Sequence, residues 1–434
     1  MNMRKSVWQN DASIPEFPTL SRELRTDVLV IGGGLAGLLT AWELRQRGVD
    51  VVLVEKGQIC SATTAHTTAK LTAQHGLIYQ KLIRSLGVEG ASQYYKANAE
   101  AVEKLMNLCR RFGAQMEEKA NFVYSSDRRK LDRELDAFQK LGIPAIFDEA
   151  PPLPFSTAGA LGIPGQAQFH PLKLAASLAK ELTIYENSRV TELIGTTAKT
   201  EHGRIRAKKI VVATHFPFLN KHGSYFLKLY QHRSYLLALE NAGTLDSVYV
   251  SDDKKGMSFS SFGGTLLLGG GGHRTGKHGG GWRELREFAA KHYPNAAEMN
   301  HWAAQDTMSL DGIPYIGQYS RNTPDLYVAA GFNKWGMTGS MVSAMLLADL
   351  ITEKDNDYSG VFSPSRSILK PQLLFNCAET TANFLIPTTK RCPHLGCALK
   401  YNREEHSWDC SCHGSRFTES GEVLDDPANG DWRP

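Results

Sequence analysis

Cysteine and histidine residues near the C-terminal end have the types and spacing of metal ligands. Five of the seven cysteines follow residue 376, and two short motifs stand out, Cys392-Pro-His394 and Cys410-Ser-Cys-His413. Two thiolates and two neutral imidazoles at this spacing can hold a [2Fe-2S] centre, with the thiolates on one iron and the imidazoles on the other. Imidazole ligands raise the reduction potential of such a centre. A structural Cys2His2 zinc site is the alternative.

The longer motifs resemble a known family. Residues 392–397 (CPHLGC) and 410–417 (CSCHGSRF) are similar to the cluster loops of the Rieske proteins of cytochrome bc complexes. The resemblance implies a [2Fe-2S] cluster on the four ligands above and a disulfide between Cys397 and Cys412. It also implies a hydrogen bond from Ser415 to a cluster sulfur, and a Pro loop over the cluster at Asp426-Pro427-Ala428.

The segment before the first cluster loop departs from that family. Rieske domains usually place several strands there, whereas Leu369–Pro387 has the pattern of a linker and a helix. We therefore expect a small all-β Rieske module that is shortened on its N-terminal side. Two interpretations stay open: a functional cluster, or a weakly assembled and vestigial one.

A second chemical motif lies near the N-terminal end. Gly32-Gly33-Gly34-Leu35-Ala36-Gly37 fits G-x-G-x-x-G between an apolar strand at 27–31 and a helix at 35–47, and a second strand ends at Glu55. Gly32 allows a tight turn, Gly34 lets a pyrophosphate approach the backbone, and Gly37 lets helix and strand pack closely. The Glu55 carboxylate suits a ribose 2′-hydroxyl. The motif predicts a bound dinucleotide, and a purely structural glycine turn is the alternative.

Later motifs decide which dinucleotide, by resemblance. Residues 311–317 (DGIPYIG) and 325–338 (DLYVAAGFNKWGMT) are similar to the C-terminal signature of the D-amino-acid oxidase/glycine oxidase superfamily, and 188–190 and 210–214 match further parts of its nucleotide domain. The resemblance implies FAD and oxidation of a C–N bond by hydride transfer to flavin N5. The cofactor-binding residues that we expect are Gly32, Gly34, Leu35, Ala36, Gly37, Glu55, Lys56, Thr67, Thr68, Val190, Thr214, Gly331, Gly336, Met337 and Thr338.

Residues that act on the substrate are harder to recognise, because hydride transfer to a flavin needs no protein nucleophile. Arg233 and Arg274 lie on or after predicted sheet strands, and a bidentate arginine suits a substrate carboxylate. We take both as candidate substrate ligands, with an ion pair or a satisfied core polar group as the alternative. His170 and Lys334 are weaker candidates. His66 is a polar loop histidine or a covalent flavin anchor.

Composition and charge exclude several other classes. The chain is 42% hydrophobic and 22% charged, which is ordinary for a globular protein and excludes a disordered or collagen-like chain. The net charge of +4, with no dense basic stripe, gives no reason to expect a nucleic-acid partner. The longest nearly apolar stretch, 340–351, is too short to be a transmembrane segment. No apolar export signal is visible at the N-terminus, so we expect a cytoplasmic protein.

The predicted fold class is α/β (α+β): a Rossmann-like FAD-binding domain with an inserted antiparallel-sheet substrate domain, plus the small Rieske module. An N-terminal extension covers residues 1–24, the FAD-dependent oxidoreductase domain 25–365, a linker with a helix 366–388, and the Rieske module 389–434. Within the large domain, the FAD-binding parts are about 25–90, 150–215 and 305–355, and the substrate parts are about 91–149 and 216–304. Helices are predicted near 91–112, 127–141, 171–182 and 335–352.

The combined prediction is an FAD-dependent oxidoreductase that oxidises a small amine or amino acid. Electrons would then pass singly through the [2Fe-2S] cluster to an acceptor other than oxygen, since flavin takes two electrons and the cluster one. An oxygen-using oxidase with a vestigial tail is one alternative. A non-enzymatic sensor with a flavin and a redox-active disulfide is the other.

Overall fold

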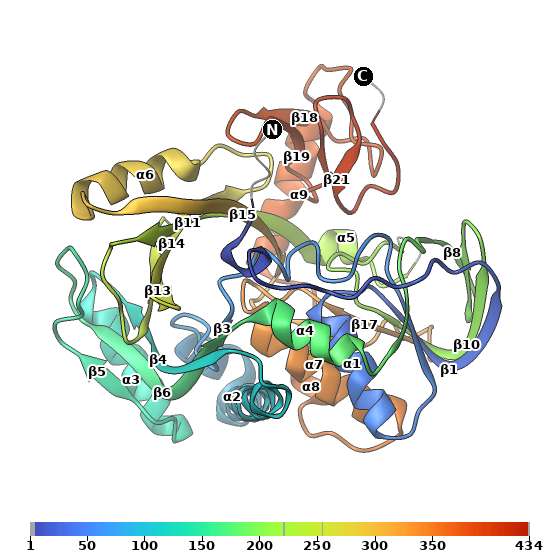
Figure 1. Ribbon diagram of the computed structural model, residues 1–434, viewed down its shortest axis with the longest axis horizontal. Coiled ribbons are helices and arrows are strands. Elements are labelled where there is room, and N and C mark those ends of the chain that lie inside the picture. The colour runs from blue at the N-terminus through green and yellow to red at the C-terminus, as the bar shows by residue number, and fades with distance from the viewer. Residues whose placement is uncertain (1–4, 220–221, 254, 433–434) are drawn as a thin grey trace.

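We describe a computed structural model of the chain, residues 5–219, 222–253 and 255–432 (Figure 1). It has three sheets, which correspond to nucleotide-binding, substrate and Rieske parts. The predicted α/β fold class is confirmed. No helix within these described residues is long and apolar enough to cross a membrane.

The nucleotide-binding sheet has eight strands in the order β16-β17-β10-β1-β2-β7, with the β8–β9 hairpin attached to β10. Its central strands are parallel, as a βαβ arrangement requires. The strands are β1 (Glu23–Ile31), β2 (Val51–Val54), β7 (Thr183–Tyr185), β8 (Val190–Ile194), β9 (Thr197–Thr200), β10 (Arg204–Val212), β16 (Tyr315–Gln318) and β17 (Leu326–Ala330).

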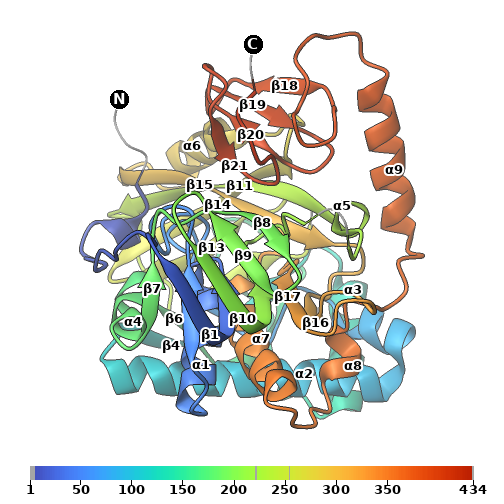
Figure 2. The same ribbon diagram turned by 90° about the vertical axis from the view of Figure 1, so that its right-hand side faces the viewer.

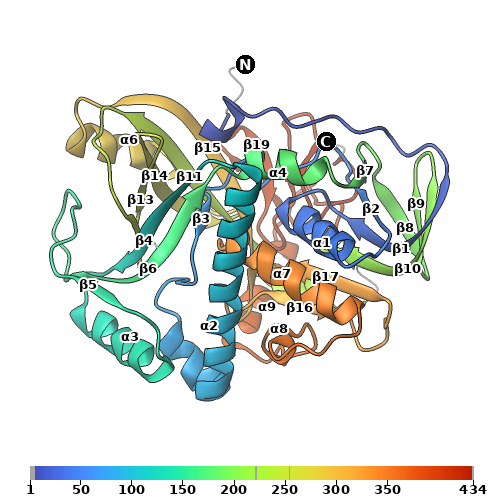
Figure 3. The ribbon, with the colours of Figure 1, turned by 60° about the horizontal axis from the view of Figure 1, so that its bottom comes forward.

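The apolar run at the end of β1 has both faces buried. Val28 and Val30 pack in one core with helices α1 (Leu35–Gln46), α4 (Pro171–Ala179) and α7 (Gly336–Ile351) (Figure 3). Leu29 and Ile31 pack on the opposite face in a core with residues of the β8–β9 hairpin. This two-sided burial explains why the strand reads as a continuous apolar run and not as an alternating one.

The substrate sheet has nine strands in the order β15-β11-β14-β13-β12-β4-β6-β3, with β5 paired to β6. Most pairs are antiparallel; β12 and β4 are parallel. The strands are β3 (Lys70–Leu71), β4 (Met116–Tyr124), β5 (Ile146–Asp148), β6 (Ala160–Phe169), β11 (Leu229–Glu240), β12 (Val248–Ser251), β13 (Ser258–Phe262), β14 (Thr265–Arg274) and β15 (Ala297–Ser309).

Helices α2 (Tyr79–Phe112), α3 (Arg128–Leu141) and α6 (Gly281–His292) accompany the substrate sheet. The helix predicted from residue 91 begins earlier, because two helices join at a kink. Gly87 at the kink has φ +74°, a left-handed conformation that interrupts the helical pattern of the sequence. Short helices complete the large domain: η1 (Val7–Gln9), α5 (Tyr225–Lys228) and α8 (Ser359–Phe362).

The Rieske part is a four-stranded antiparallel sheet, β18 (Leu399–Asn402), β19 (Ser407–Cys410), β20 (Arg416–Phe417) and β21 (Val423–Asp425). Helix α9 (Pro371–Phe384) precedes it and runs along the outside of the molecule (Figure 2). The described residues between α7 and β18 form no strand in a sheet, so the base strands of a full Rieske domain are absent from this stretch. The small sheet lies above β11 and β15 of the substrate sheet (Figure 1).

Candidate functional site

A cavity of about 580 Å³ runs from the glycine turn to the substrate sheet. It is lined by many of the predicted cofactor-binding residues: Gly32, Gly34, Leu35, Ala36, Glu55, Lys56, Val190, Thr214, Gly336 and Met337. The tertiary structure thus gathers residues that are spread over 300 positions of the sequence into one elongated space.

The glycine turn has the geometry that its sequence predicts. Gly32 has φ +112°, and a Cβ there would lie 2.5 Å from the carbonyl oxygen of Ala213. A Cβ on Gly37 would lie 1.9 Å from the carbonyl oxygen of Gly32. At Gly34, which precedes α1, the nearest atom to a Cβ is the Thr64 hydroxyl at 3.5 Å, so this side is open to the cavity. The open cradle at the helix N-terminus fits a pyrophosphate.

Glu55 stands at the end of β2 in a fixed position. Its Oε2 accepts a hydrogen bond from the backbone N–H of Gly33 at 2.7 Å, and its Oε1 accepts one from Gly57 at 3.0 Å. Each oxygen keeps a lone pair, so the carboxylate can still accept a ribose hydroxyl. The next residue, Lys56, forms a 2.7 Å ion pair with Asp426 of the Pro loop.

The threonine-rich loop differs from expectation. Thr63, Thr64 and His66 line the cavity. The hydroxyls of Thr67 and Thr68 are instead engaged locally: Thr67 Oγ1 accepts from the Ala69 N–H and Thr68 Oγ1 accepts from Lys70 Nζ, both at 2.9 Å. Their cofactor role stays a prediction. The sequence does not distinguish Thr63 and Thr64 from the neighbouring threonines. Only the path of the loop in the structure shows that these two line the cavity.

His66 has the features of a polar loop histidine. Its Nδ1 lies 2.8 Å from the carbonyl oxygen of Ala62, and burial lowers its pKa. The N-terminal extension supports this loop, because the indole N–H of the buried Trp8 donates to the carbonyl oxygen of Thr67 at 2.7 Å. His170, a weaker substrate candidate, accepts from the Lys173 N–H as the N-cap of α4.

The turn before α7 brings the C-terminal signature to the cavity. Gly336 and Met337 line it. Thr338 instead joins two segments, since its hydroxyl accepts from the Thr72 N–H at 3.1 Å and donates to the Thr72 carbonyl at 2.8 Å. Gly331 has φ +75°, and it packs against Leu229.

Two consecutive residues of this turn, Asn333 and Lys334, are left-handed without being glycine, with φ of +53° and +73°. Such backbone strain persists only where the surroundings enforce it. The Asn333 side chain is held by Ser309, whose N–H donates to Asn333 Oδ1 at 2.8 Å. The strained turn therefore makes Lys334 a stronger candidate for a functional residue than the sequence indicated.

Lys334 interacts electrostatically with Asp306 and Lys70, two charged residues of the substrate sheet. Its side chain keeps accessible surface, yet desolvation by the surrounding protein lowers its pKa. Burial likewise lowers the pKa of Lys70 to about 8 and raises that of Asp306, with Lys334 opposing the latter shift. Asp306 pairs across the sheet with His232, whose pKa burial lowers to about 2.

Neither Asp306 nor Lys334 forms an ion pair or hydrogen bond through its side chain with other described residues. A cluster of desolvated ionisable groups is typical of a functional site. We did not predict Asp306 or Lys70 from the sequence. No clear signal in the sequence marked them, since Asp306 lies among polar and apolar residues of a sheet strand, Trp302–Thr307.

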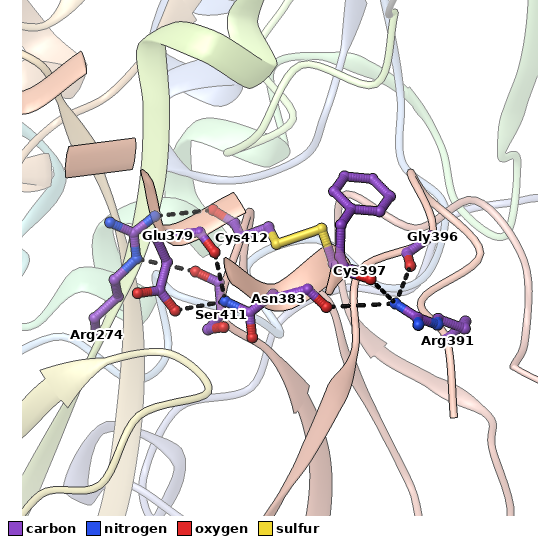
Figure 4. Close-up of a disulfide and its surroundings, with 9 residues drawn as sticks. Arg274, Glu379, Asn383, Arg391, Gly396, Cys397, Ser411 and Cys412 are labelled. Atoms are coloured by element: carbon purple, nitrogen blue, oxygen red, sulfur yellow. Dashed lines mark hydrogen bonds between the residues drawn. A yellow bond between two sulfur atoms is a disulfide. The ribbon is translucent and has the colours of Figure 1, made fainter. Parts of the chain in front are cut away.

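The two predicted substrate arginines contact the Rieske module. Arg233, 5% exposed, makes a two-point ion pair with Glu405: Nε donates to Oε1 at 3.0 Å and Nη2 contacts Oε2. Arg274 donates from Nε to the Ser411 carbonyl at 2.9 Å and from Nη2 to the Cys412 carbonyl at 3.1 Å (Figure 4). A substrate carboxylate would have to displace these partners, so the structure supports an ion pair for Arg233 and a satisfied polar group for Arg274, and the ligand role stays a prediction.

The four predicted cluster ligands are brought together at one end of the Rieske sheet. Cys392 and Cys410 are 1% exposed and their thiols are within hydrogen-bonding distance of each other. The rings of His394 and His413 meet edge to face with centroids 4.9 Å apart. The Nδ1 atom of His413 is buried without a hydrogen-bond partner among the described residues.

The protonation states of these groups suit metal binding. Desolvation lowers the pKa of His394 to about 4 and that of His413 to about 3, so both imidazoles are neutral near pH 7. The hydrogen bond between the two thiols lowers the pKa of Cys392 and raises that of Cys410, so one thiol of the pair ionises before the other. Neutral imidazoles and a thiolate are the forms that coordinate iron. The donor set fits a [2Fe-2S] cluster.

The disulfide between Cys397 and Cys412 is present, as the resemblance implied (Figure 4). Ser415 also has the implied position: its hydroxyl hydrogen-bonds to the Cys392 sulfur and accepts from the Ala428 N–H at 3.0 Å. The Pro loop is thereby tied to the cluster loops. Although Cys410 lies within 4.8 Å of the disulfide sulfurs, those two atoms are already bonded, so this trio is no separate metal site.

The cluster end of the module faces the large domain. The ring of Phe216, which follows β10 two residues after Thr214, contacts the rings of His394 and His413 with centroids 6.3 and 6.4 Å away. Phe226 contacts His413 at 6.4 Å. The cluster ligands therefore pack beside the nucleotide cavity.

Comparison with known proteins agrees with both resemblances. The family described as "FAD dependent oxidoreductase" matches residues 27–350, and "Rieske [2Fe-2S] domain" matches residues 373–433. The chain is 34% identical to the "Putative Rieske 2Fe-2S iron-sulfur protein YhfW" of Bacillus subtilis, covering 98% of this chain and 96% of that protein. It is 41% identical over 50 residues to the cytochrome b6-f complex iron-sulfur subunit of Pisum sativum, which is 12% of this chain and 21% of that one.

Among solved structures, glycine oxidase from Geobacillus kaustophilus superposes with a TM-score of 0.63. The identity is 23%, and the match covers 79% of this chain and 99% of that one. This similarity shows a shared fold for the large domain.

Proposed function

The chain belongs to the family of FAD-dependent oxidoreductases and carries a Rieske [2Fe-2S] domain, and we propose that it oxidises the C–N bond of an amino acid or amine and passes the electrons through the cluster to an acceptor other than oxygen. When bound, FAD supplies a two-electron hydride acceptor and the cluster a one-electron carrier. The residues of this chain bind and orient the substrate, exclude water and handle its proton.

One observation supports the proposed electron transfer from FAD to the cluster. The cluster ligands His394 and His413 pack against Phe216, whose near neighbour Thr214 lines the nucleotide cavity. Short separation between two redox centres favours direct electron transfer, so this packing supports a relay over a vestigial tail.

The charged group on the substrate sheet supports an amino acid as the substrate. An amine yields the hydride of its neighbouring carbon only when the nitrogen is neutral. A substrate ammonium would therefore lose a proton to the Asp306 carboxylate, the hydride would leave carbon with its electron pair, and the C–N bond would become that of a protonated imine. Lys334 and Lys70 would hold the substrate carboxylate. Because Asp306 becomes neutral in this transfer, the two lysines are left to balance the negative charge of the substrate carboxylate.

The test is anaerobic mixing of the holoenzyme with a panel of amino acids and amines, starting with glycine, the substrate in the name of the similar oxidase. We expect one member to bleach the flavin absorbance and then to produce the EPR signal of a reduced Rieske cluster. A bleached flavin beside a fully loaded cluster that stays oxidised would refute the relay. Stoichiometric peroxide in air, unchanged by loss of the cluster, would indicate an oxidase with a vestigial tail.

A panel in which nothing reduces a tightly bound flavin, together with a binding partner that depends on the Cys397–Cys412 disulfide, would indicate a redox sensor. The measured quantities are the flavin absorbance, the EPR signal and the peroxide yield, so each alternative has its own readout.

A further inference from the structure

The nucleotide cavity is walled by two domains. On one side lie the glycine turn, Glu55, Val190 and Thr214 of the large domain. The other side belongs to the Rieske module, which contributes Glu405, Arg416, Leu424, Asp425, Asp426 and Asn429. These residues come from the β18–β19 turn, β20, β21 and the Pro loop, and Ser415 ties the Pro loop to the cluster loops.

Leu424 is an exposed apolar residue, and its exposure favours contact with an apolar part of a ligand. Its side chain is 47% exposed and lies on the cavity wall, whereas its strand neighbour Phe417 is fully buried. A large apolar side chain on a cavity wall gains free energy when an apolar part of a ligand covers it. Apolar rings are present in a flavin nucleotide.

The acids of the module beside the cavity are neutralised. Asp426 pairs with Lys56, and Asp425 pairs with Arg416 at 2.8 Å. Unpaired carboxylates here would repel a pyrophosphate, whereas these pairs remove the net charge. The module wall is therefore compatible with an anionic ligand.

The module is closely docked and can act as a fixed wall. Besides the Arg233–Glu405 pair, Gln305 Nε2 donates to the Gly414 carbonyl at 2.9 Å. A Cβ on Gly276 would lie 2.5 Å from the Ser411 backbone nitrogen, and one on Gly414 would lie 2.2 Å from Gln231 Cγ. Backbones approach this closely only in a well-packed interface.

From these contacts we infer that the Rieske module forms part of the FAD-binding site. Leu424 covers an apolar part of the bound nucleotide, and the Lys56–Asp426 pair closes the cavity over it. FAD therefore binds more tightly when the module is docked, and bound FAD holds the module in place. This inference depends on FAD binding, which the family gives, and is independent of the proposed substrate and relay.

The test measures FAD binding to the full-length protein in the absence of any substrate. FAD is removed, and its dissociation constant on re-addition is read from the quenching of flavin fluorescence. We expect Leu424→Ala to weaken FAD binding about tenfold, since it removes apolar contact worth about 1.4 kcal/mol. The matched control is Leu385→Ala, at an exposed leucine of the linker away from the cavity, which should leave the constant unchanged. An unchanged cluster EPR signal in both variants verifies that the module is intact.

A measurement on the unmodified chain keeps the inference testable if Leu424→Ala does not fold. Hydrogen exchange of residues 423–429 should slow when FAD is added to the apoprotein. Equal FAD affinity in Leu424→Ala and the parent chain would overturn the inference. So would a hydrogen-exchange rate of residues 423–429 that does not change when FAD is added. Either result would leave the proposed oxidation and relay untouched, because those are read from substrate-driven reduction.

Discussion

Arg233 on β11 and Glu405 in the Rieske module form a buried two-point ion pair that joins the substrate sheet to the iron–sulfur module. Their side chains are 6% and 7% exposed. Arg416 also donates to Glu405 at 2.8 Å, and the Tyr235 hydroxyl donates to it at 3.1 Å. Two guanidinium groups and one hydroxyl thus neutralise and hydrogen-bond the Glu405 carboxylate. Removal of one charged partner would leave a buried charge unpaired.

Stability in acid should depend on Glu405. Its two arginine neighbours outweigh desolvation and lower its pKa to about 2. Because the carboxyl binds its proton more readily in the unfolded chain, its contribution is fully present above the unfolded pKa of about 4.3 and is lost as the pH falls towards 2. We expect the free energy of unfolding to fall over this range, and Glu405→Gln to remove part of the slope.

The measurement is denaturant unfolding between pH 2 and 6. At pH 7 Glu405→Gln should cost about 3 kcal/mol, since it leaves the arginines without their charge partner. Arg283→Ala is the control, since it breaks an exposed pair with Glu287 and should cost under about 1 kcal/mol. Parallel pH curves for Glu405→Gln and the parent chain would contradict this role.

The close docking of the module should be sensitive to one methyl group. Gly276→Ala places a Cβ 2.5 Å from the Ser411 nitrogen in a residue with φ +73°, so it adds a clash to backbone strain. Gly243→Ala is matched, because φ is +76° there and no atom lies within 4 Å. We expect Gly276→Ala to lower the unfolding free energy by about 1–3 kcal/mol more than Gly243→Ala. Equal losses would show that the interface adapts at no cost.

Cluster binding should depend on Cys410 and not on every cysteine of the C-terminal part. Cys410→Ser removes a thiolate ligand, so the Rieske EPR signal should vanish and the iron content fall to near zero. Cys377→Ser changes an exposed cysteine of α9 and should retain both. If Cys410→Ser kept its iron and spectrum, the ligand set would be wrong. Zinc in place of iron in the parent chain would favour the structural alternative.

Asp306 should matter for the reductive step. Asp306→Asn cannot take a proton from the substrate, so the anaerobic rate of flavin reduction should fall about 10²-fold or more at pH 7. Because burial raises the pKa of Asp306, the rate in the parent chain should decline at lower pH, where this carboxyl is protonated. Asp27→Asn, at a surface pair with Lys208, is the control and should react normally. A normal rate and pH profile in Asp306→Asn would exclude Asp306 as the base.

Residue spacing in the sequence was sufficient to predict those parts of the site that depend on neighbouring residues. Gly32 is needed for the positive φ of the turn and Gly37 because the Gly32 carbonyl approaches it, and Cys392 with His394 and Cys410 with His413 are close because only one or two residues lie between them. Such short-range geometry follows from backbone conformation, so spacing alone reveals it.

The contacts between residues of different domains could be identified only from the tertiary structure. Arg233 meets Glu405 at a separation of 172 residues, and Arg274 meets Ser411 at 137. The sequence shows two arginines suited to a carboxylate but not which carboxylate reaches them. Likewise, Asp306 and Lys334 interact electrostatically only because β15 and the turn before α7 converge. Long-range contacts depend on how whole elements pack, and no local pattern records that packing.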